Sequence, residues 1–406
     1  MRSFCLLIVL LSAAMVIFSG CGGDSSSPKP VTGVSLSPDE MDIELGHSRE
    51  ITPTVNGDNK NLTWYVNDIE NGNELVGEIT ENSPVTYTAP NWLPNPSAVL
   101  IKAVSDEDTT LYDSCAVNIT FEKLFVDPED GSDGSGANGC VNLPYKSITK
   151  AITQVSPGMT VVAQPGTYTA DTGEDFPIIC HTDSVTIEGT DWEECRIQGH
   201  DEVGTYGLIV TVGRTGQAFR KFTLEQGLPA DDCSIMLYVS GNDAHIDSIR
   251  VGERSNYSVA RVYGAVRPLI ENCQFIVNDG NPDQRGITMY PTSDGAIIRN
   301  CTVIGYDVGL RIMNSSNALV EGCTFEGNEF GAEAKSEAPP GSLSPDFGGG
   351  ARGSTGGNIF NNNVYCGLRI ELDHPVYAKY NTWTNDPPEP DVDFCVVGDG
   401  GVIFED

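Results

Sequence analysis

The sequence is poor in basic residues. It holds 23 Lys and Arg against 57 Asp and Glu, which gives a formal net charge of −34 at pH 7. Nucleic acids and anionic lipids attract proteins through positive charge, so the general field of this chain excludes binding to either. The acidic surplus is typical of a solvated surface, or of local clusters that bind divalent cations.

Residue patterns that bind zinc are also missing. The chain has 12 cysteines but no CxxC pair, and its 5 histidines show no HxxxH spacing. Both absences argue against a zinc site. Helical periodicity is scarce as well, and the 44 glycines and 24 prolines indicate frequent turns. These features together predict an all-β protein.

A short apolar run stands at the N-terminus. The charge of Arg2 precedes the run from Phe4 to Phe18, and Ser19-Gly20-Cys21 follows. This order is that of a signal peptide over residues 1–20. The run is shorter than the roughly 20 apolar residues that a membrane-spanning helix needs.

A cysteine directly after two small residues resembles the lipobox of bacterial lipoproteins, although Phe18 stands where Leu or Val is usual. The resemblance implies that Cys21 is acylated and anchors the chain to a membrane. Since no Asp follows Cys21, it also implies an outer-membrane lipoprotein of the cell envelope, either surface-exposed or facing the periplasm. The alternative is an ordinary secretory peptide. Residues 21–30 have the composition of a flexible tether.

Short strands with period-two alternation fill residues 31–122, which predicts a β-sandwich. Trp64 is expected in its core. The segment resembles bacterial immunoglobulin-like domains of the Big2 type in VSLSP (34–38), LTWYV (62–66) and VTYTAP (85–90). Such domains serve as spacers or stalks, so the resemblance implies no catalytic site here.

Two sequence columns repeat through the second half of the chain. The first column comprises Phe222, Ile249, Cys273, Cys301, Cys323, Asn358 and Asn381. The second comprises Gly286, Gly309, Gly331 and Gly367, at nearly parallel spacings. Two strands therefore recur in fixed order with variable loops between them, and no helix intervenes. The pattern predicts a right-handed parallel β-helix over residues 123–406, with coils stacked about 4.8 Å apart.

The start of this solenoid has its own signals. Ser147 is placed to cap a short helix whose apolar face would close the open end of the core. The segment resembles the DUF1565 family of pectate-lyase-like β-helix proteins in FVDP (125–128), GSDGSG (131–136), PYKSITKAI (144–152) and PGTY (165–168). The resemblance implies the fold and an envelope setting, but no reaction.

The cysteines allow two states. Outside the cytoplasm disulfides can form. Cys301 and Cys323, in one column, are predicted to stack as buried thiols, because side chains in register point the same way. For Cys140 and Cys180, near the helical cap, a disulfide and separate thiols remain equally open.

Arg311, Glu333 and Arg369 share one place after the second-column glycine. The simpler interpretation is an alternating charge ladder on an outer face. The sharper one is a catalytic basic residue, as in polysaccharide lyases of this fold. A lyase would also need a carboxylate cluster for Ca²⁺. Aspartates near the coil turns lack a fixed spacing; they are Asp279, Asp283, Asp294 and Asp307.

The acidic loop 127–134 offers Asp127, Asp130 and Asp133 as Ca²⁺ ligands, but without EF-hand spacing. The alternative is a set of turns. The NTD and GHG motifs of polygalacturonase-type glycosidases are absent. We therefore predict a non-catalytic surface lipoprotein that presents its β-helix to glycans or other surface polymers. The alternative is a polysaccharide lyase or glycoside hydrolase that acts on acidic polysaccharide.

Overall fold

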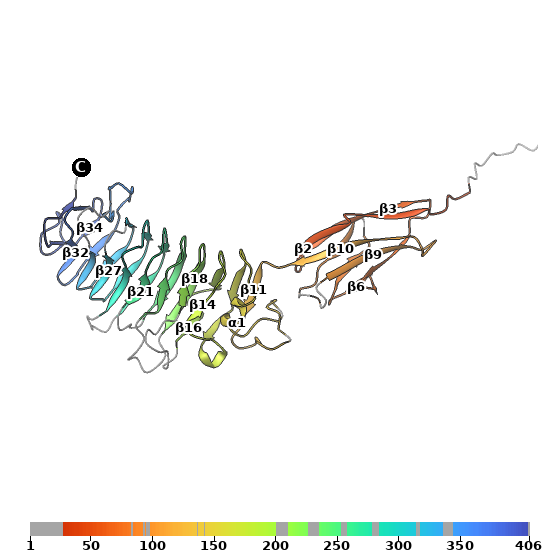
Figure 1. The fold of residues 1–406 in the computed structure, drawn as a ribbon, viewed down its shortest axis with the longest axis horizontal. Helices are drawn as coiled ribbons and strands as arrows, with labels where there is room; N and C mark the ends of the chain where they lie inside the picture. Colours follow the sequence, from red (N-terminus) through yellow and green to blue (C-terminus); the bar gives the residue numbers. More distant parts are fainter. Residues whose placement is uncertain are drawn as a thin grey trace, which may run out of the picture.

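Two β-rich parts follow one another along the chain in the computed structural model (Figure 1). The structure describes residues 27–82, 84–91, 94, 98–135, 137–141, 143–199, 210–225, 235–252, 258–277, 284–313, 317–335 and 344–404. The predicted signal peptide and Cys21 lie outside the described residues. Within the described ranges, no helix has the length and apolar character needed to cross a membrane.

The first part is a β-sandwich of two five-stranded sheets, ordered β1-β3-β8-β7-β6 and β2-β10-β9-β4-β5. Trp64 is 2% exposed and packs in a core with Tyr87, Ile101 and Cys115, as its place on a central strand predicts. The strands are β1 (Gly33–Ser37), β2 (Glu40–Glu44), β3 (Ser48–Asn56), β4 (Leu62–Val66), β5 (Ile69–Glu70), β6 (Gly72–Asn73), β7 (Gly77–Thr80), β8 (Val85–Thr88), β9 (Ala98–Ser105) and β10 (Tyr112–Thr120).

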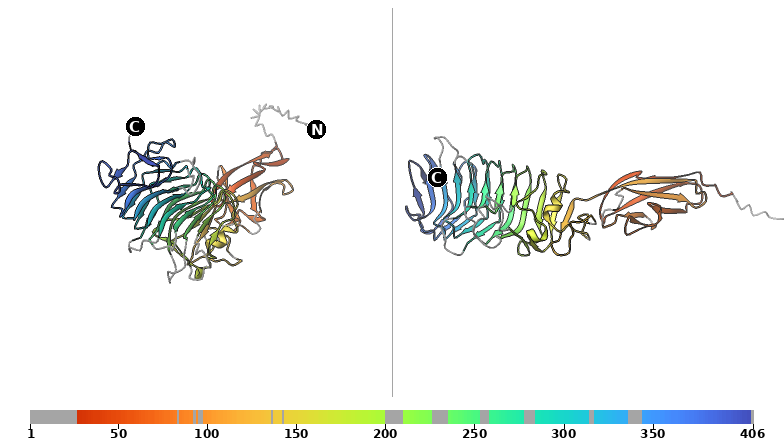
Figure 2. Two further views of the ribbon diagram at one scale, coloured as in Figure 1. Left: turned by 60° about the vertical axis from the view of Figure 1, so that its left-hand side comes forward. Right: turned by 60° about the horizontal axis from the view of Figure 1, so that its bottom comes forward.

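The second part is a parallel β-helix, whose coils lie side by side in both views of Figure 2. Two long parallel sheets form its walls, and β33 (Pro375–Tyr377) pairs with β36 (Gly401–Ile403) at the far end. The fold class predicted from the repeats is confirmed.

The first sheet of the β-helix has 15 strands. They are β11 (Lys123–Val126), β12 (Thr160–Ala163), β13 (Gly166–Tyr168), β15 (Thr186–Gly189), β16 (Cys195–Gln198), β18 (Ala218–Glu225), β20 (His245–Val251), β22 (Leu269–Glu271), β23 (Gln274–Ile276), β25 (Ile297–Arg299), β26 (Thr302–Ile304), β28 (Leu319–Glu321), β29 (Thr324–Glu326), β31 (Ile359–Asn361) and β34 (Thr382–Trp383).

The second sheet has nine strands in sequential order. They are β14 (Ile178–Ile179), β17 (Val210–Val212), β19 (Leu237–Val239), β21 (Ser258–Val262), β24 (Arg285–Met289), β27 (Val308–Met313), β30 (Phe330–Lys335), β32 (Cys366–Glu371) and β35 (Phe394–Val396).

The glycine column of the second sheet has a steric cause. Gly309 lies opposite Gly286, since Arg285 pairs with Val308 and Ile287 with Leu310. A Cβ on Gly309 would lie 2.5 Å from the carbonyl oxygen of Gly331, closer than real Cβ atoms come. The same 2.5 Å contact recurs from coil to coil along the column. Glycine therefore lets neighbouring strands approach at this point.

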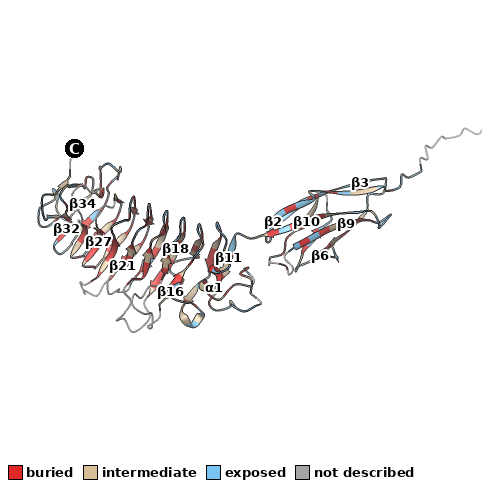
Figure 3. Ribbon diagram, in the orientation of Figure 1, coloured by how far each residue is buried: buried red, intermediate tan, exposed pale blue. Residues whose placement is uncertain are grey.

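Buried residues alternate with partly exposed ones along many strands of the β-helix, such as β25 and β29 (Figure 3). Inside, buried side chains stack coil on coil; the rings of Phe325 and Phe360, for example, lie 5.3 Å apart. Each such buried apolar side chain contributes about 1.5–3 kcal/mol relative to exposure. The column from Cys273 to Cys323 is in register, because Gln274, Thr302 and Thr324 pair in order directly after it.

The helix α1 (Ile148–Ile152) covers the near end of this core, as predicted. The hydroxyl of Ser147 accepts a hydrogen bond from the backbone N–H of Lys150 at 3.0 Å. Glu174, which is buried, accepts further bonds from the backbone N–H groups of Ile148 and Thr149. Burial raises the pKa of the Glu174 carboxyl, against the effect of these donors.

Candidate functional site

Outward-pointing side chains of the second sheet line up because its strands stack in register. We call two adjacent columns the arginine face. One column comprises Thr211, Tyr238, Arg261, Thr288, Arg311, Glu333 and Arg369. The other follows it two residues later and comprises Tyr263, Tyr290, Met313, Lys335 and Glu371. Basic and aromatic side chains dominate this face, although the chain as a whole carries a net charge of −34.

Arg311, Glu333 and Arg369 lie on neighbouring strands of this face, as the column predicts. Glu333 is 1% exposed and lies between the two guanidinium groups. Its Oε1 is 3.3 Å from Nη1 of Arg369, and its Oε2 pairs with Nε of Arg311. The ladder continues, because Arg369 also pairs with Glu371, which is 3.2 Å from Nζ of Lys335. These charges largely neutralise one another.

A second cluster on the arginine face was missed in the sequence. The guanidinium carbon of Arg261 lies 4.2 Å from the centre of the Tyr290 ring and 5.7 Å from that of Tyr263. Burial raises the pKa of the neighbouring Tyr238 phenol, and the positive charge of Arg261 acts in the opposite direction. A signal existed, because Val259-Ala260-Arg261 repeats Gly309-Leu310-Arg311 with valine in place of glycine.

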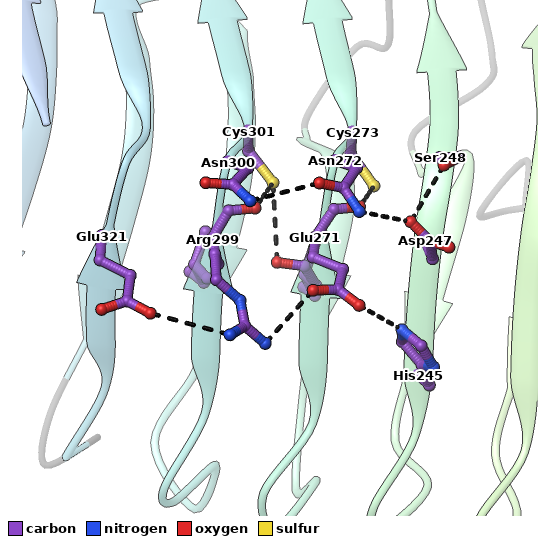
Figure 4. Close-up of polar contacts among 12 residues, drawn as sticks. His245, Asp247, Ser248, Glu271, Asn272, Cys273, Arg299, Asn300, Cys301 and Glu321 are labelled. Atoms are coloured by element: carbon purple, nitrogen blue, oxygen red, sulfur yellow. Dashed lines mark hydrogen bonds and ion pairs between the residues drawn. The ribbon is translucent and has the colours of Figure 1, made fainter. Parts of the chain in front are cut away.

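The first sheet carries a different outer column, which we call the ladder face (Figure 4). Its members are Glu188, Arg220, Asp247, Glu271, Arg299 and Glu321. Nη2 of Arg299 is 3.2 Å from Oε2 of Glu271, and Nε2 of His245 is 2.8 Å from Oε1 of the same carboxylate. Arg299 also lies 3.9 Å from Glu321, on its other side. Cations and carboxylates therefore alternate from Glu271 to Glu321, whereas Asp247 and Glu271 are neighbouring carboxylates.

The aspartates proposed as Ca²⁺ ligands serve local structure. Asp127 Oδ1 accepts hydrogen bonds from the backbone N–H groups of Glu129 and Asp130. Asp133 accepts from the Ser147 hydroxyl at 2.7 Å and from the backbone N–H of Lys146. Among the residues that the structure describes, no group of three or more His, Cys, Asp or Glu side chains could hold a metal ion. The hydrogen bonds of Asp127 and Asp133 fit the interpretation of the loop as turns that position the cap.

Cysteine pairing differs from the candidate bridge. Cys180 is a buried thiol whose Sγ contacts the Thr182 carbonyl oxygen, so it does not bridge to Cys140. A disulfide joins Cys366 and Cys395 instead, with 6.1 Å between their Cα atoms. It fastens β35 to β32 beside Arg369, because Cys395 is the register partner of that arginine.

The cysteine column of the first sheet consists of buried thiols, as predicted for Cys301 and Cys323. The Cys301 Sγ–H points at the Arg299 carbonyl oxygen at 3.3 Å, and Cys323 makes the same contact with Glu321 at 3.4 Å. Burial raises the pKa of the Cys323 thiol, which keeps it protonated. These cysteines are core residues and no part of a surface site.

Comparison with known sequences finds one family. The sequence profile described as "Protein of unknown function (DUF1565)" matches residues 130–390, which is more than half of the chain. No curated protein matches it.

Solved structures resemble the β-helix at low identity. Pectate lyase Pel9A is 13% identical with a TM-score of 0.44, over 69% of this chain and 78% of that one. The A-module of the Azotobacter vinelandii mannuronan C-5 epimerase AlgE4 is 14% identical with a TM-score of 0.41, over 58% and 67%. The tailspike gp49 of Acinetobacter baumannii bacteriophage Fri1, a capsular polysaccharide depolymerase, is 11% identical with a TM-score of 0.34, over 75% and 64%. Such similarity concerns the fold and carries no activity over to this chain.

Proposed function

Since this chain belongs to the DUF1565 family, whose description assigns no activity, we propose its function from its own residues. It is a membrane-anchored lipoprotein of the cell envelope that binds polysaccharide along the arginine face without cleaving it. Acylated Cys21 holds it to the outer membrane, and the sandwich, which resembles an immunoglobulin-like stalk, carries the β-helix.

The arginine face is the observation that carries this proposal. Arg261, Arg311, Lys335 and Arg369 gather on one sheet face of a chain that has 57 acidic residues against 23 basic ones. Tyrosine rings stand among them, and Tyr263 is 45% exposed. Aromatic rings offer large, rigid contact area, and guanidinium groups offer fixed donors for oxygen-rich ligands. The strands from β19 to β32 extend the face over roughly 25 Å, at about 4.8 Å per strand, which suits an extended polymer.

The charge pairing on this face favours binding over catalysis. A carboxylate that acts as a base or nucleophile needs access to its substrate. Glu333 is instead 1% exposed and held between Arg311 and Arg369. We therefore assign Glu333 to holding the Arg311 and Arg369 guanidinium groups in place on the face.

A glycan array tests the binding proposal. We expect the full-length chain, purified in detergent, to retain one or more polysaccharides and to lose them when Arg261 and Arg369 are both changed to Gln. The matched control changes Arg196 and Arg220 to Gln, because these arginines are ion-paired on the first sheet. Absence of any glycan ligand would leave only a structural role for the β-helix.

One observation favours a second candidate, an enzyme that acts on acidic polysaccharide. The Arg311 and Arg369 guanidinium groups lie on either side of a carboxylate, and a buried acid flanked by cations is a frequent feature of active sites. This candidate predicts release of unsaturated products, lost on Arg311→Ala or Arg369→Ala. Incubation with a panel of acidic polysaccharides, with and without Ca²⁺, tests it. If none of them yields a product, the enzyme candidate is wrong.

A further inference from the structure

Arg261 is positioned by the middle of the second sheet. It lies in β21 between Ala260 and Val262, both fully buried, so its side chain points outward. Its register partners are Tyr238 on β19 and Thr288 on β24. Neither partner carries a charge at neutral pH. The next coils along the same column hold the ion-paired trio around Glu333.

The charge of Arg261 has no carboxylate partner within the described part of the chain. Other arginines, by contrast, are ion-paired: Arg267 pairs with Asp243 at 2.7 Å, and Arg369 pairs with Glu333 at 3.3 Å. The Nε atom of Arg261 is buried and finds no hydrogen-bond acceptor among the described residues. A buried donor without an acceptor is unfavourable, so an acceptor that reaches this guanidinium group is favoured.

Two tyrosine rings hold this guanidinium in place. Its carbon lies 4.2 Å from the Tyr290 ring centre, and the Tyr263 and Tyr290 ring centres are 5.9 Å apart at an interplanar angle of 57°. A guanidinium that stacks on a ring keeps its N–H donors in its own plane, so the ring contact does not use them. Tyr263 is 45% exposed, which leaves a ring surface beside those donors.

We propose that Arg261, Tyr263 and Tyr290 form a subsite for one uronic acid unit of a polysaccharide. The Arg261 fork binds the sugar carboxylate, because planar carboxylates match two parallel N–H donors. The Tyr263 ring packs on the C–H face of the pyranose ring. This inference rests on the proposed glycan-binding function and names its ligand class, a carboxylated polysaccharide.

Matched probes separate the carboxylate from the rest of the sugar. Binding of the full-length chain in detergent is measured by calorimetry with oligogalacturonate and oligomannuronate, each beside its methyl ester, and with dextran sulfate. We expect at least one acid form to bind about tenfold or more tightly than its ester, which is the effect of one charge-assisted hydrogen bond. A preference for the ester, or binding of dextran sulfate alone, overturns the carboxylate assignment.

Variants locate the subsite. Arg261→Gln should weaken the preferred acid about tenfold or more and leave its ester unchanged, whereas Tyr263→Ala should weaken both forms several-fold. Arg267→Gln is the control, because Arg267 sits in the turn after β21 and pairs with Asp243. Unchanged acid binding in Arg261→Gln refutes the subsite. Binding of neutral glycans alone keeps the proposed function and removes this inference, and binding of no glycan removes both.

Discussion

The two outer faces of the β-helix have the same coil spacing but differ in whether every arginine finds a carboxylate partner. On the ladder face, each cation meets a carboxylate on the next coil; Arg299 lies between Glu271 and Glu321. On the arginine face, Arg261 lies between Tyr238 and Thr288 and keeps its charge unpaired within the described residues. A solenoid places the same column position on every coil, so the residue chosen on the neighbouring coil decides whether a charge is structural or available.

The largest expected effect is the loss of stability when the carboxylate of a buried ion pair is removed, compared with that of an exposed pair. Glu333→Ala leaves Arg311 and Arg369 facing each other without their buried carboxylate, and should lower the free energy of unfolding by about 3–5 kcal/mol. Glu271→Ala on the ladder face is the control and should cost below about 1 kcal/mol, since its partners are partly exposed. Urea unfolding of both variants measures this; equal losses would show that the two faces pair charges alike.

The second sheet is also the one that a disulfide fastens. Cys366→Ser opens a link that spans 29 residues, and should lower the free energy of unfolding by about 3 kcal/mol. The control is Cys323→Ser, a buried thiol of the first sheet. Adding reductant should lower the melting temperature of the native chain and of the Cys323→Ser variant, but not that of Cys366→Ser. A reductant effect that persists in Cys366→Ser would contradict the assigned pairing.

A smaller effect tests the close approach of strands in the second sheet. Gly309→Ala places its Cβ 2.5 Å from the Gly331 oxygen, and should cost about 1–3 kcal/mol through overpacking. Gly401→Ala, where a Cβ meets nothing within 4 Å, is the control and should be near neutral. Thermal unfolding of the pair decides; a fully stable Gly309→Ala would mean that the strands separate at little cost.

The smallest effect concerns the exposed pairing of the ladder face. Arg299→Gln should cost below about 1 kcal/mol at low salt, because the Arg299 side chain is 38% exposed. That loss should shrink further in 1 M salt, where the Debye length is about 3 Å. Unfolding measured at both salt concentrations checks it. A loss that grows with salt would contradict an electrostatic origin.

Much of the fold was predictable from the sequence because its signals are local or periodic. The columns through Cys301 and Gly309 fixed which residues stack, and the register agrees. The position of Ser147 before the helix predicted its capping hydrogen bond with the backbone N–H of Lys150. By contrast, the Cys366–Cys395 disulfide could not be predicted, because it joins a strand of the glycine column to one that lacks the column glycine. The sequence could not decide between a disulfide and separate thiols for Cys140 and Cys180, because the loops between them have no repeating period.

The candidate site divides in the same way. The trio of Arg311, Glu333 and Arg369 was visible in the sequence, because each follows a column glycine by two residues. Its mutual neutralisation, with Glu333 1% exposed, depends on side-chain burial that no spacing encodes. Arg261 was hidden because Val259 stands where the column has glycine.

By itself, the sequence determined an all-β chain with a sandwich and a β-helix, since strand alternation and a repeating coil are written in residue order. The tertiary structure alone decided which charges stay unpaired. Whether Arg261 meets a carboxylate depends on which residues the preceding and following coils place about 4.8 Å away, across loops of unequal length. The stacking of coils therefore decides which charges on the arginine face can bind a ligand. The sequence repeat alone does not contain this information.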